Sequence, residues 1–203
     1  MSNFYIADTH FGHVNALTFD ERPYATIEQS DAQMTENWNS VVTDEDTVYI
    51  LGDFAMKKIG QEAYLSYMKA LNGKKVLVLG NHDITSFSKE EKRKAKLIEV
   101  CNYKEVKEDN GCIVICSHYP ILFYRGSYKH FMYHFCGHVH TSREDKLLSQ
   151  WINQLVLSRE IKTDSYGNIL NVGCMKDYMN YTPQPFWRLK QIIDERRELL
   201  EEH

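Results

Sequence analysis

Short apolar runs recur along the chain at intervals that suit a sheet with helices between its strands. Runs rich in Val, Ile, Leu, Tyr and Cys occupy residues 3–7, 46–51, 75–79, 112–117, 132–136 and 168–172, and most are followed directly by Gly or Asp. A short apolar run that ends at a turn residue is typical of a buried strand. The pattern therefore predicts a strand at each of these places.

Longer segments between the runs carry the periodicity of amphipathic helices. Two apolar faces lie between the N-cap candidate Thr26 and the helix stop Gly73; they comprise Ile27, Met34, Trp38 and Val41, then Tyr64, Leu65, Met68 and Leu71. Residues 88–98 open with the capping-box pattern Ser88-Lys89-Glu90-Glu91, and residues 189–200 carry another apolar stripe. We expect helices at these places, with their apolar faces packed on the core.

Strands that alternate with helices predict an α/β fold, with helices on the faces of a sheet. The 203 residues suit one domain spanning residues 1–203. Residues 119–130 and 177–185 show neither periodicity, so we expect long loops there.

Composition and charge argue against several functions. A formal net charge of −4 does not suit a surface that grips long duplex DNA through its phosphates. No apolar run approaches the roughly 20 residues needed to cross a membrane, and the N-terminal segment does not resemble a signal peptide. Five cysteines without a C-x-x-C pair indicate reduced thiols. We therefore expect a cytoplasmic protein.

Five polar patches follow the predicted strands. They are Asp8-Thr9-His10, Gly52-Asp53, Gly80-Asn81-His82-Asp83, Ser117-His118 and Gly137-His138-Val139-His140. Ligands in α/β sheets lie beyond the carboxyl ends of the strands, so these oxygen and imidazole groups can meet at one sheet edge. A packing role alone does not explain five such clusters, of which three begin with Gly. A site for two metal ions does.

This set of patches, in this order, resembles the calcineurin-like metallophosphoesterase superfamily over about residues 4–175. The opening Ala7-Asp8-Thr9-His10-Phe11-Gly12-His13-x-Asn15, with Arg22-Pro23 further on, also resembles small bacterial and phage-type members. The resemblance implies a four-layer α/β/β/α sandwich of two mixed sheets.

The resemblance also implies two metal sites. Asp8, His10 and His140 would hold one divalent ion, Asn81, His118 and His138 would hold the second, and Asp53 would bridge them. A shared carboxylate suits two cations about 3.5–4 Å apart, since it offsets their repulsion. Nitrogen and oxygen ligands without a thiolate suit Mn, Fe, Zn or Ni, and the order of affinities does not choose among them. We expect Mn first, with Fe, Zn or Ni as alternatives.

Further roles are expected around these ligands. His82 would protonate the leaving oxygen, with Asp83 orienting its ring; the alternative for His82 is a supporting structural role. His13, Asn15 and Arg22 lie in the first loop, where they can meet substrate phosphate. Weaker candidates are Arg125, Tyr124 and His130, whereas His134 lies within a predicted strand and is expected in the core.

These features together predict hydrolysis of a phosphate monoester or diester by attack of a metal-bound hydroxide. The expected partner is a small phosphorylated substrate, with no long duplex DNA and no membrane. One alternative is a nuclease that acts on short or single-stranded nucleic acid. Another is a non-catalytic metal-binding scaffold, which would be expected to lack the ligand set or His82. The sequence leaves the substrate, the metal in cells and the oligomeric state open.

Overall fold

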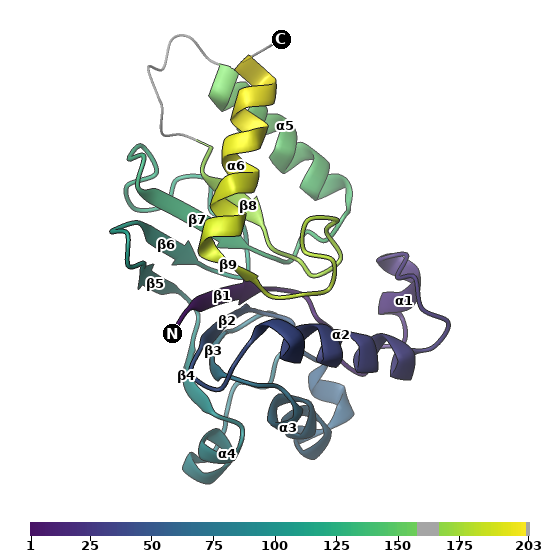
Figure 1. Ribbon diagram of the computed structural model, residues 1–203. Coiled ribbons are helices and arrows are strands. Elements are labelled where there is room, and N and C mark those ends of the chain that lie inside the picture. Colours follow the sequence, from purple (N-terminus) through teal and green to yellow (C-terminus); the bar gives the residue numbers. More distant parts are fainter. Residues whose placement is uncertain (158–166, 202–203) are drawn as a thin grey trace.

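Two sheets lie face to face in the computed structural model, which describes residues 1–157 and 167–201 (Figure 1). The first sheet has the order β4-β3-β2-β1-β9. Its strands are β4 (Leu97–Cys101), β3 (Lys74–Val78), β2 (Thr47–Leu51), β1 (Asn3–Ile6) and β9 (Gln184–Pro185). All neighbours are parallel except β9, which pairs antiparallel with β1, so this sheet is mixed.

The second sheet has the order β5-β6-β7-β8. Its strands are β5 (Lys104–Lys107), β6 (Ile113–Cys116), β7 (Met132–Cys136) and β8 (Ile169–Asn171). β5 pairs antiparallel with β6, whereas β6, β7 and β8 are parallel. Aromatic rings pack between the two sheets, and Tyr5 on β1 meets Phe135 on β7 edge to face at 5.0 Å.

Helices cover the outer faces of this pair of sheets (Figure 1). On one side are α2 (Ile27–Val41), α3 (Gln61–Ala70) and α4 (Lys89–Lys94), and on the other are α5 (Arg143–Leu157) and α6 (Phe186–Glu201). Two shorter pieces, α1 (Ala16–Phe19) and the 3₁₀ turn η1 (Lys57–Ile59), lie near the loops that follow β1 and β2. The predicted α/β/β/α sandwich of two mixed sheets is therefore confirmed.

Local signals account for most of these elements. Thr26 caps α2, because its side chain accepts a hydrogen bond from the Gln29 amide. The buried face of α2 includes Met34 and Trp38, as the periodicity predicts, but Val41 at its end is 40% exposed. Each predicted strand is present within two residues of its expected bounds.

The predicted helix over residues 88–98 is wrong in its second half. Ser88 and Glu91 do form the capping box, but α4 ends at Lys94 and Lys96 takes a left-handed φ of 51°. Leu97 then enters β4, where its side chain is buried against the sheet. Pairing with β3 supplies the backbone hydrogen bonds that a longer helix would have made, and it also buries the apolar residues.

Three strands and one long helix are absent from the predicted elements. The strands are β4, β5 and β9, and the helix is α5, whose buried residues are Asp145 and Ile152 alone. Leu148, Trp151, Ile152 and Val156 recur at helical spacing, so the sequence carries a periodic signal for α5 that the prediction missed. None of the helices in the described residues has the length and apolar character needed to span a bilayer.

Lys75 is an unusual core residue of β3, since its side chain is fully buried. Its Nζ donates hydrogen bonds to the carbonyl oxygens of Leu71 at 2.5 Å and Gly73 at 3.0 Å. Burial lowers the pKa of Lys75 to about 8, because the charged form is poorly solvated there.

The low pKa of Lys75 predicts a stability that depends on pH. Between pH 8 and the usual lysine pKa of about 10.4, the unfolded chain binds more protons than the folded one, so the contribution of Lys75 to folding stability rises with pH. We expect the free energy of unfolding of the wild type, minus that of Lys75→Met, to increase across this window by at most about 1.4 kcal/mol per pH unit. Urea unfolding of both proteins from pH 7 to 10 measures it, and a constant difference would contradict the expectation.

Candidate metal centre

The five polar patches meet at one edge of the two sheets. Three of them follow the adjacent parallel strands β1, β2 and β3, and the other two follow the adjacent parallel strands β6 and β7. The sheets join at this edge, because the Ala7 amide after β1 donates to the Val172 carbonyl after β8 at 2.9 Å. The loops therefore project their side chains into a common space, as parallel strand ends do.

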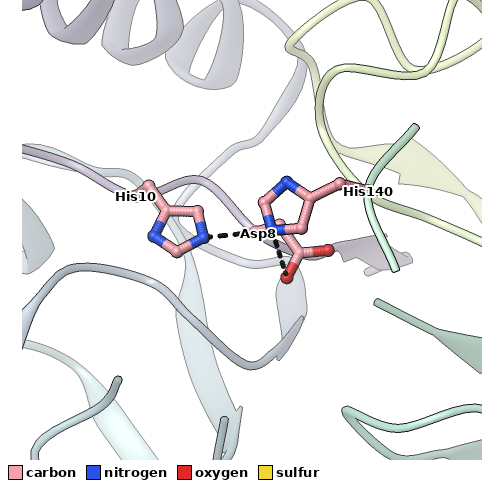
Figure 2. A group of neighbouring side chains, drawn as sticks. All are labelled: Asp8, His10 and His140. Atoms are coloured by element: carbon pink, nitrogen blue, oxygen red, sulfur yellow. Dashed lines mark hydrogen bonds and ion pairs between the residues drawn. The ribbon is translucent and has the colours of Figure 1, made fainter. Parts of the chain in front are cut away.

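Asp8, His10 and His140 form the first cluster, and Figure 2 shows the three side chains converging. The Nε2 atoms of His10 and His140 are 3.3 Å apart. A carboxylate oxygen of Asp8 lies 4.0 Å from His140 Nε2. These atoms are spaced as the ligands of a single ion would be.

Asp53, His118 and His138 form the second cluster, which Asn81 joins from the loop after β3. His118 Nε2 lies 3.1 Å from Asn81 Oδ1 and 3.5 Å from Asp53 Oδ2. The same Asp53 oxygen is 3.7 Å from His10 Nε2 in the first cluster. Asp53 therefore stands between the two clusters, within reach of an ion in each.

The backbone at these positions is strained. Asp8, His10, Asp53, His138 and His140 all have φ between 47° and 69°, the left-handed region that side chains other than Gly rarely adopt. Such residues cost about 1–3 kcal/mol each and cluster at functional sites. The five are a majority of the non-glycine residues with positive φ in the described chain.

Glycines before the ligands leave space for this arrangement. A Cβ on Gly52 would stand 2.3 Å from the ring nitrogen Nδ1 of His118, and one on Gly137 would stand 2.6 Å from an Asp8 carboxylate oxygen. Both contacts are far too short for real atoms. Any side chain at either position would therefore displace a candidate ligand.

The hydrogen bonds around His118 show that the site suits a cation. Its Nδ1 lies 3.0 Å from the Leu51 carbonyl oxygen, an acceptor, so Nδ1 carries the proton and donates it there. In the neutral ring Nε2 then has only a lone pair, yet it faces the oxygens of Asn81 and Asp53. A metal ion placed between these acceptor atoms would remove their mutual repulsion, because each of them can bind the ion through a lone pair.

Burial adjusts the charges of the first cluster. It lowers the pKa of His10 to about 2, so this ring is neutral and able to bind a metal. Burial also raises the pKa of Asp8 to about 6. His10 Nδ1 is buried and has no hydrogen-bond partner in the described residues.

Asp20 supports His140 from behind, a role that the sequence does not indicate. Its carboxylate accepts a hydrogen bond from His140 Nδ1 at 2.7 Å, which directs Nε2 toward Asp8 and His10. Asp20 follows no predicted strand and lies 120 residues from its partner, so the chain carries no local signal for it. Carboxylates of this kind commonly orient histidine ligands.

Arg22 does not face the substrate, so its predicted phosphate-binding role is wrong. Its guanidinium is fully buried beneath the ligand loop and paired with Asp20 at 3.0 Å. It also donates to the backbone carbonyls of Thr9 at 3.0 Å and Asp8 at 3.2 Å. Arg22 thus ties the strained Asp8–His10 segment to Asp20.

Asp83 does not orient the His82 ring, which corrects another expectation. Its carboxylate accepts hydrogen bonds from the amides of Asp53, Phe54 and Gly80. The Tyr64 hydroxyl also donates to it, at 2.7 Å. The buried Asp83 side chain therefore holds the loops after β2 and β3 together through these hydrogen bonds.

His82 is half-buried at the His10 side of the site. Its ring centroid is 5.8 Å from that of His10, and its backbone amide donates to Asp53 Oδ1 at 2.9 Å. His13 lies nearby, with its ring centroid 5.3 Å from that of His10, and burial lowers its pKa. Asn15 is exposed before α1, and its side chain makes no capping hydrogen bond.

The weaker candidates lie in other surroundings. Arg125 forms an ion pair with Glu105 on β5, and the buried Tyr124 hydroxyl donates to the Met132 carbonyl at 3.2 Å. His130 is exposed. His134 is fully buried, as predicted, and its Nε2 accepts a hydrogen bond from the Ile121 amide.

Replacement of Asp20 by Asn should weaken metal binding in the first cluster. The amide keeps the size of the side chain but removes the charge that holds the His140 ring, and changes of this kind lower metal affinity by about 10–100-fold. Calorimetric metal titration measures the loss, with Asp177→Asn, an exposed carboxylate, as a matched control. Equal affinities for the Asp20 variant and the wild type would show that Asp20 does not position the ligand.

Comparisons with known proteins agree with this geometry. The model of the family described as "Calcineurin-like phosphoesterase" matches residues 4–172. The uncharacterized protein MJ1445 from Methanocaldococcus jannaschii is 40% identical over 78 residues, which make up 38% of this chain and 44% of that protein. The Gene 66 protein of Mycobacterium phage L5 is 40% identical over 86 residues, 41% of each chain. This chain thus matches less than half the length of these curated relatives.

A solved structure extends the similarity over nearly the whole chain. The crystal structure of AQ665, a protein of unknown function from Aquifex aeolicus, superimposes with a TM-score of 0.63 and 25% identity. The match covers 94% of this chain and 98% of that protein. Because the family model spans every candidate ligand from Asp8 to His140, the chain belongs to the calcineurin-like phosphoesterase family.

Proposed function

We propose that this protein hydrolyses phosphate monoesters or diesters with two divalent metal ions that share Asp53. The observation that carries the proposal is the position of the Asp53 carboxylate, with one oxygen 3.7 Å from His10 Nε2 and 3.5 Å from His118 Nε2. Asp8 and His140 complete one set of ligands, and Asn81 and His138 complete the other. Nitrogen and oxygen donors suit Mn, Fe, Zn and Ni, and Mn is the first metal we propose to test.

When bound, the two ions would neutralise phosphate charge and lower the pKa of an attacking water molecule. The residues of the chain contribute position and proton transfer. The strained loops hold the ligands in place before substrate arrives, and Asp83 fixes the loop that carries Asn81 and His82. His82 lies beside the ligands, and its ring is not among the hydrogen-bond partners of Asp83. It can therefore donate a proton to the leaving oxygen. The amide of Asn81 adds no negative charge, which leaves the site attractive to an anion.

Metal stoichiometry and a substrate panel test the proposal. Elemental analysis after mild reconstitution should give two ions per chain, and saturation at one would overturn the shared carboxylate. Phosphomonoesters, cyclic and linear diesters, nucleotides and short nucleic acids should then be assayed with each metal after chelation. Hydrolysis of none of them would support a non-catalytic scaffold instead. A cytoplasmic location is part of the proposal, since all five cysteines are free thiols.

Small phosphorylated molecules are proposed as substrates in preference to long duplex DNA. The net charge of −4 supports this choice, because gripping a duplex requires many cationic contacts. We expect hydrolysis of a small ester to change by less than about threefold between 50 and 200 mM salt, whereas six to ten phosphate contacts would give a loss of about 10³–10⁵ in affinity over the same range. Salt titration of activity and of binding to single-stranded DNA measures this. A steep fall would favour the nuclease.

A further inference from the structure

A groove of ≈ 790 Å³ runs beside the metal centre, between α5 and the loop that follows β6. Tyr119, Pro120 and Leu122 line it from the loop, and Leu147, Leu148 and Trp151 line it from the helix. Two of these side chains are more than half exposed although they are large and apolar in character, Tyr119 at 51% and Leu147 at 54%. Apart from His138, none of the residues that line the groove has a role in the metal centre described above.

The groove is continuous with the metal centre. His138, a member of the second ligand cluster, is itself one of the lining residues. The Tyr119 ring stands 4.4 Å from that of His138 and 5.0 Å from that of His118, centroid to centroid. Its hydroxyl is 3.4 Å from Asn81 Oδ1. A phosphate held by the second cluster would therefore place one of its ester groups at the mouth of the groove.

The walls of the groove suit a flat aromatic group. Tyr119 offers a ring at the metal end, and Trp151 lies further along, braced edge to face by Phe123 at 5.7 Å. Glu144, Gln150 and Gln154 supply hydrogen-bonding groups among the apolar residues. No Lys or Arg is among the described residues that line it, so a second phosphate has no cation to meet. Apolar walls with a few polar groups are typical of small-molecule sites.

We propose that this groove holds the organic group of the substrate, and that this group carries a planar aromatic ring of nucleobase size. The inference rests on the proposed phosphoesterase function, which it deepens by naming the substrate class. Stacking on Tyr119 and Trp151 provides the affinity, as it does for bases on aromatic side chains. The phosphate reaches the metal ligands while the ring lies against α5.

Binding of phosphonates tests the inference without requiring hydrolysis. On the Mn-loaded protein, calorimetry should show that benzylphosphonate binds at least about fivefold more tightly than methylphosphonate, the smallest gain that stacking of one ring gives. Hexylphosphonate controls for apolar area and should bind more weakly than benzylphosphonate. Equal affinities of the benzyl and methyl compounds would overturn the proposal, and so would a hexyl compound that binds as well as the benzyl one.

Matched variants locate the ring. Tyr119→Ala and Leu147→Ser should each reduce the preference for benzyl over methyl, whereas Tyr119→Phe should keep it because the ring remains. Leu157→Ser is the control, since Leu157 is 52% exposed on the same helix but does not line the groove. A benzyl preference that survives both Tyr119→Ala and Leu147→Ser would place the ring elsewhere and overturn the assignment.

Kinetics separate this inference from the proposed function. We would compare three diesters that share a nitrophenolate leaving group. Their second substituent is methyl, hexyl or thymidine joined through its 5′ oxygen. The thymidine ester should have the lowest KM, and equal KM values with measurable turnover would overturn the inference alone. Absence of turnover for these three diesters and for every phosphomonoester, diester and nucleotide of the substrate panel, together with a benzyl preference in binding, would overturn the proposed function and leave the aromatic site supported.

Discussion

Replacement of Asp53 by Asn is expected to weaken both metal sites at once. One oxygen of this carboxylate lies within 3.7 Å of a histidine nitrogen in each cluster, so the variant removes the negative charge that offsets the repulsion between two cations. Each ion, when bound, would contribute several kcal/mol of transition-state stabilisation. Loss of both should lower kcat/KM by more than about 10³-fold. Elemental analysis and metal titration should show weaker binding of both ions.

The comparison with other single ligands makes this result specific. His140→Ala should weaken the first site more than the second, and His138→Ala should do the reverse, because each belongs to one cluster. Asp109→Asn, an exposed carboxylate away from the ligands, should leave metal content and rate unchanged. An Asp53→Asn protein that loses one ion and holds the other with unchanged affinity would show that Asp53 serves a single site.

Replacement of His82 by Ala is expected to leave metal binding unchanged and to remove the proton donor that we propose. The ring centroid of His82 is 5.8 Å from that of His10, while Asn81 supplies the side chain that joins the second cluster from this loop. A positioned acid contributes about 10²–10⁴-fold to the rate. The rate of hydrolysis of alkyl phosphoesters should therefore fall by that factor in the variant. The rate of hydrolysis of nitrophenyl phosphate should fall clearly less, because its leaving group needs little protonation. Steady-state rates on both substrates measure the difference.

Metal content distinguishes the possible outcomes for His82→Ala. Full metal content with equal losses on both substrates would mean that His82 binds or orients phosphate. Reduced metal content would make it a ligand or a support for one. His130→Ala is the control for removal of an imidazole, since His130 is exposed and outside both clusters, and it should retain the full rate.

Most of the sheet framework follows from the local pattern of residues. Apolar runs such as Val76 to Val78 stand out in the sequence and are buried in the folded chain, and a strand lies at each of them. Two of the strands absent from the prediction, β5 and β9, have weaker patterns. β5 reads Lys-Glu-Val-Lys and pairs with β6 alone, while β9 is two residues long. Their pairing depends on a neighbour that is distant in sequence or already folded.

The sequence by itself also indicated which residues to examine for metal binding. Seven candidate ligands follow strands that are parallel neighbours, and the geometry of parallel sheets alone brings such loops together. Glycines at 52, 80 and 137 open three of the patches, and the structure shows that a Cβ at each would collide with a candidate ligand or its backbone. The position of each patch after an apolar run carried part of that information, and the resemblance to the calcineurin-like superfamily supplied the ligand assignment.

The roles of charged residues around the ligands were decided by tertiary structure. Arg22 and Asp83 both looked available for catalysis, but Arg22 is buried against Asp20 and Asp83 is bound by three backbone amides and a tyrosine. Asp20 reaches His140 across 120 residues of sequence. A buried charge must find partners wherever the fold provides them, and those partners come from other strands and loops. The aromatic groove likewise exists only because α5 lies beside the loop after β6.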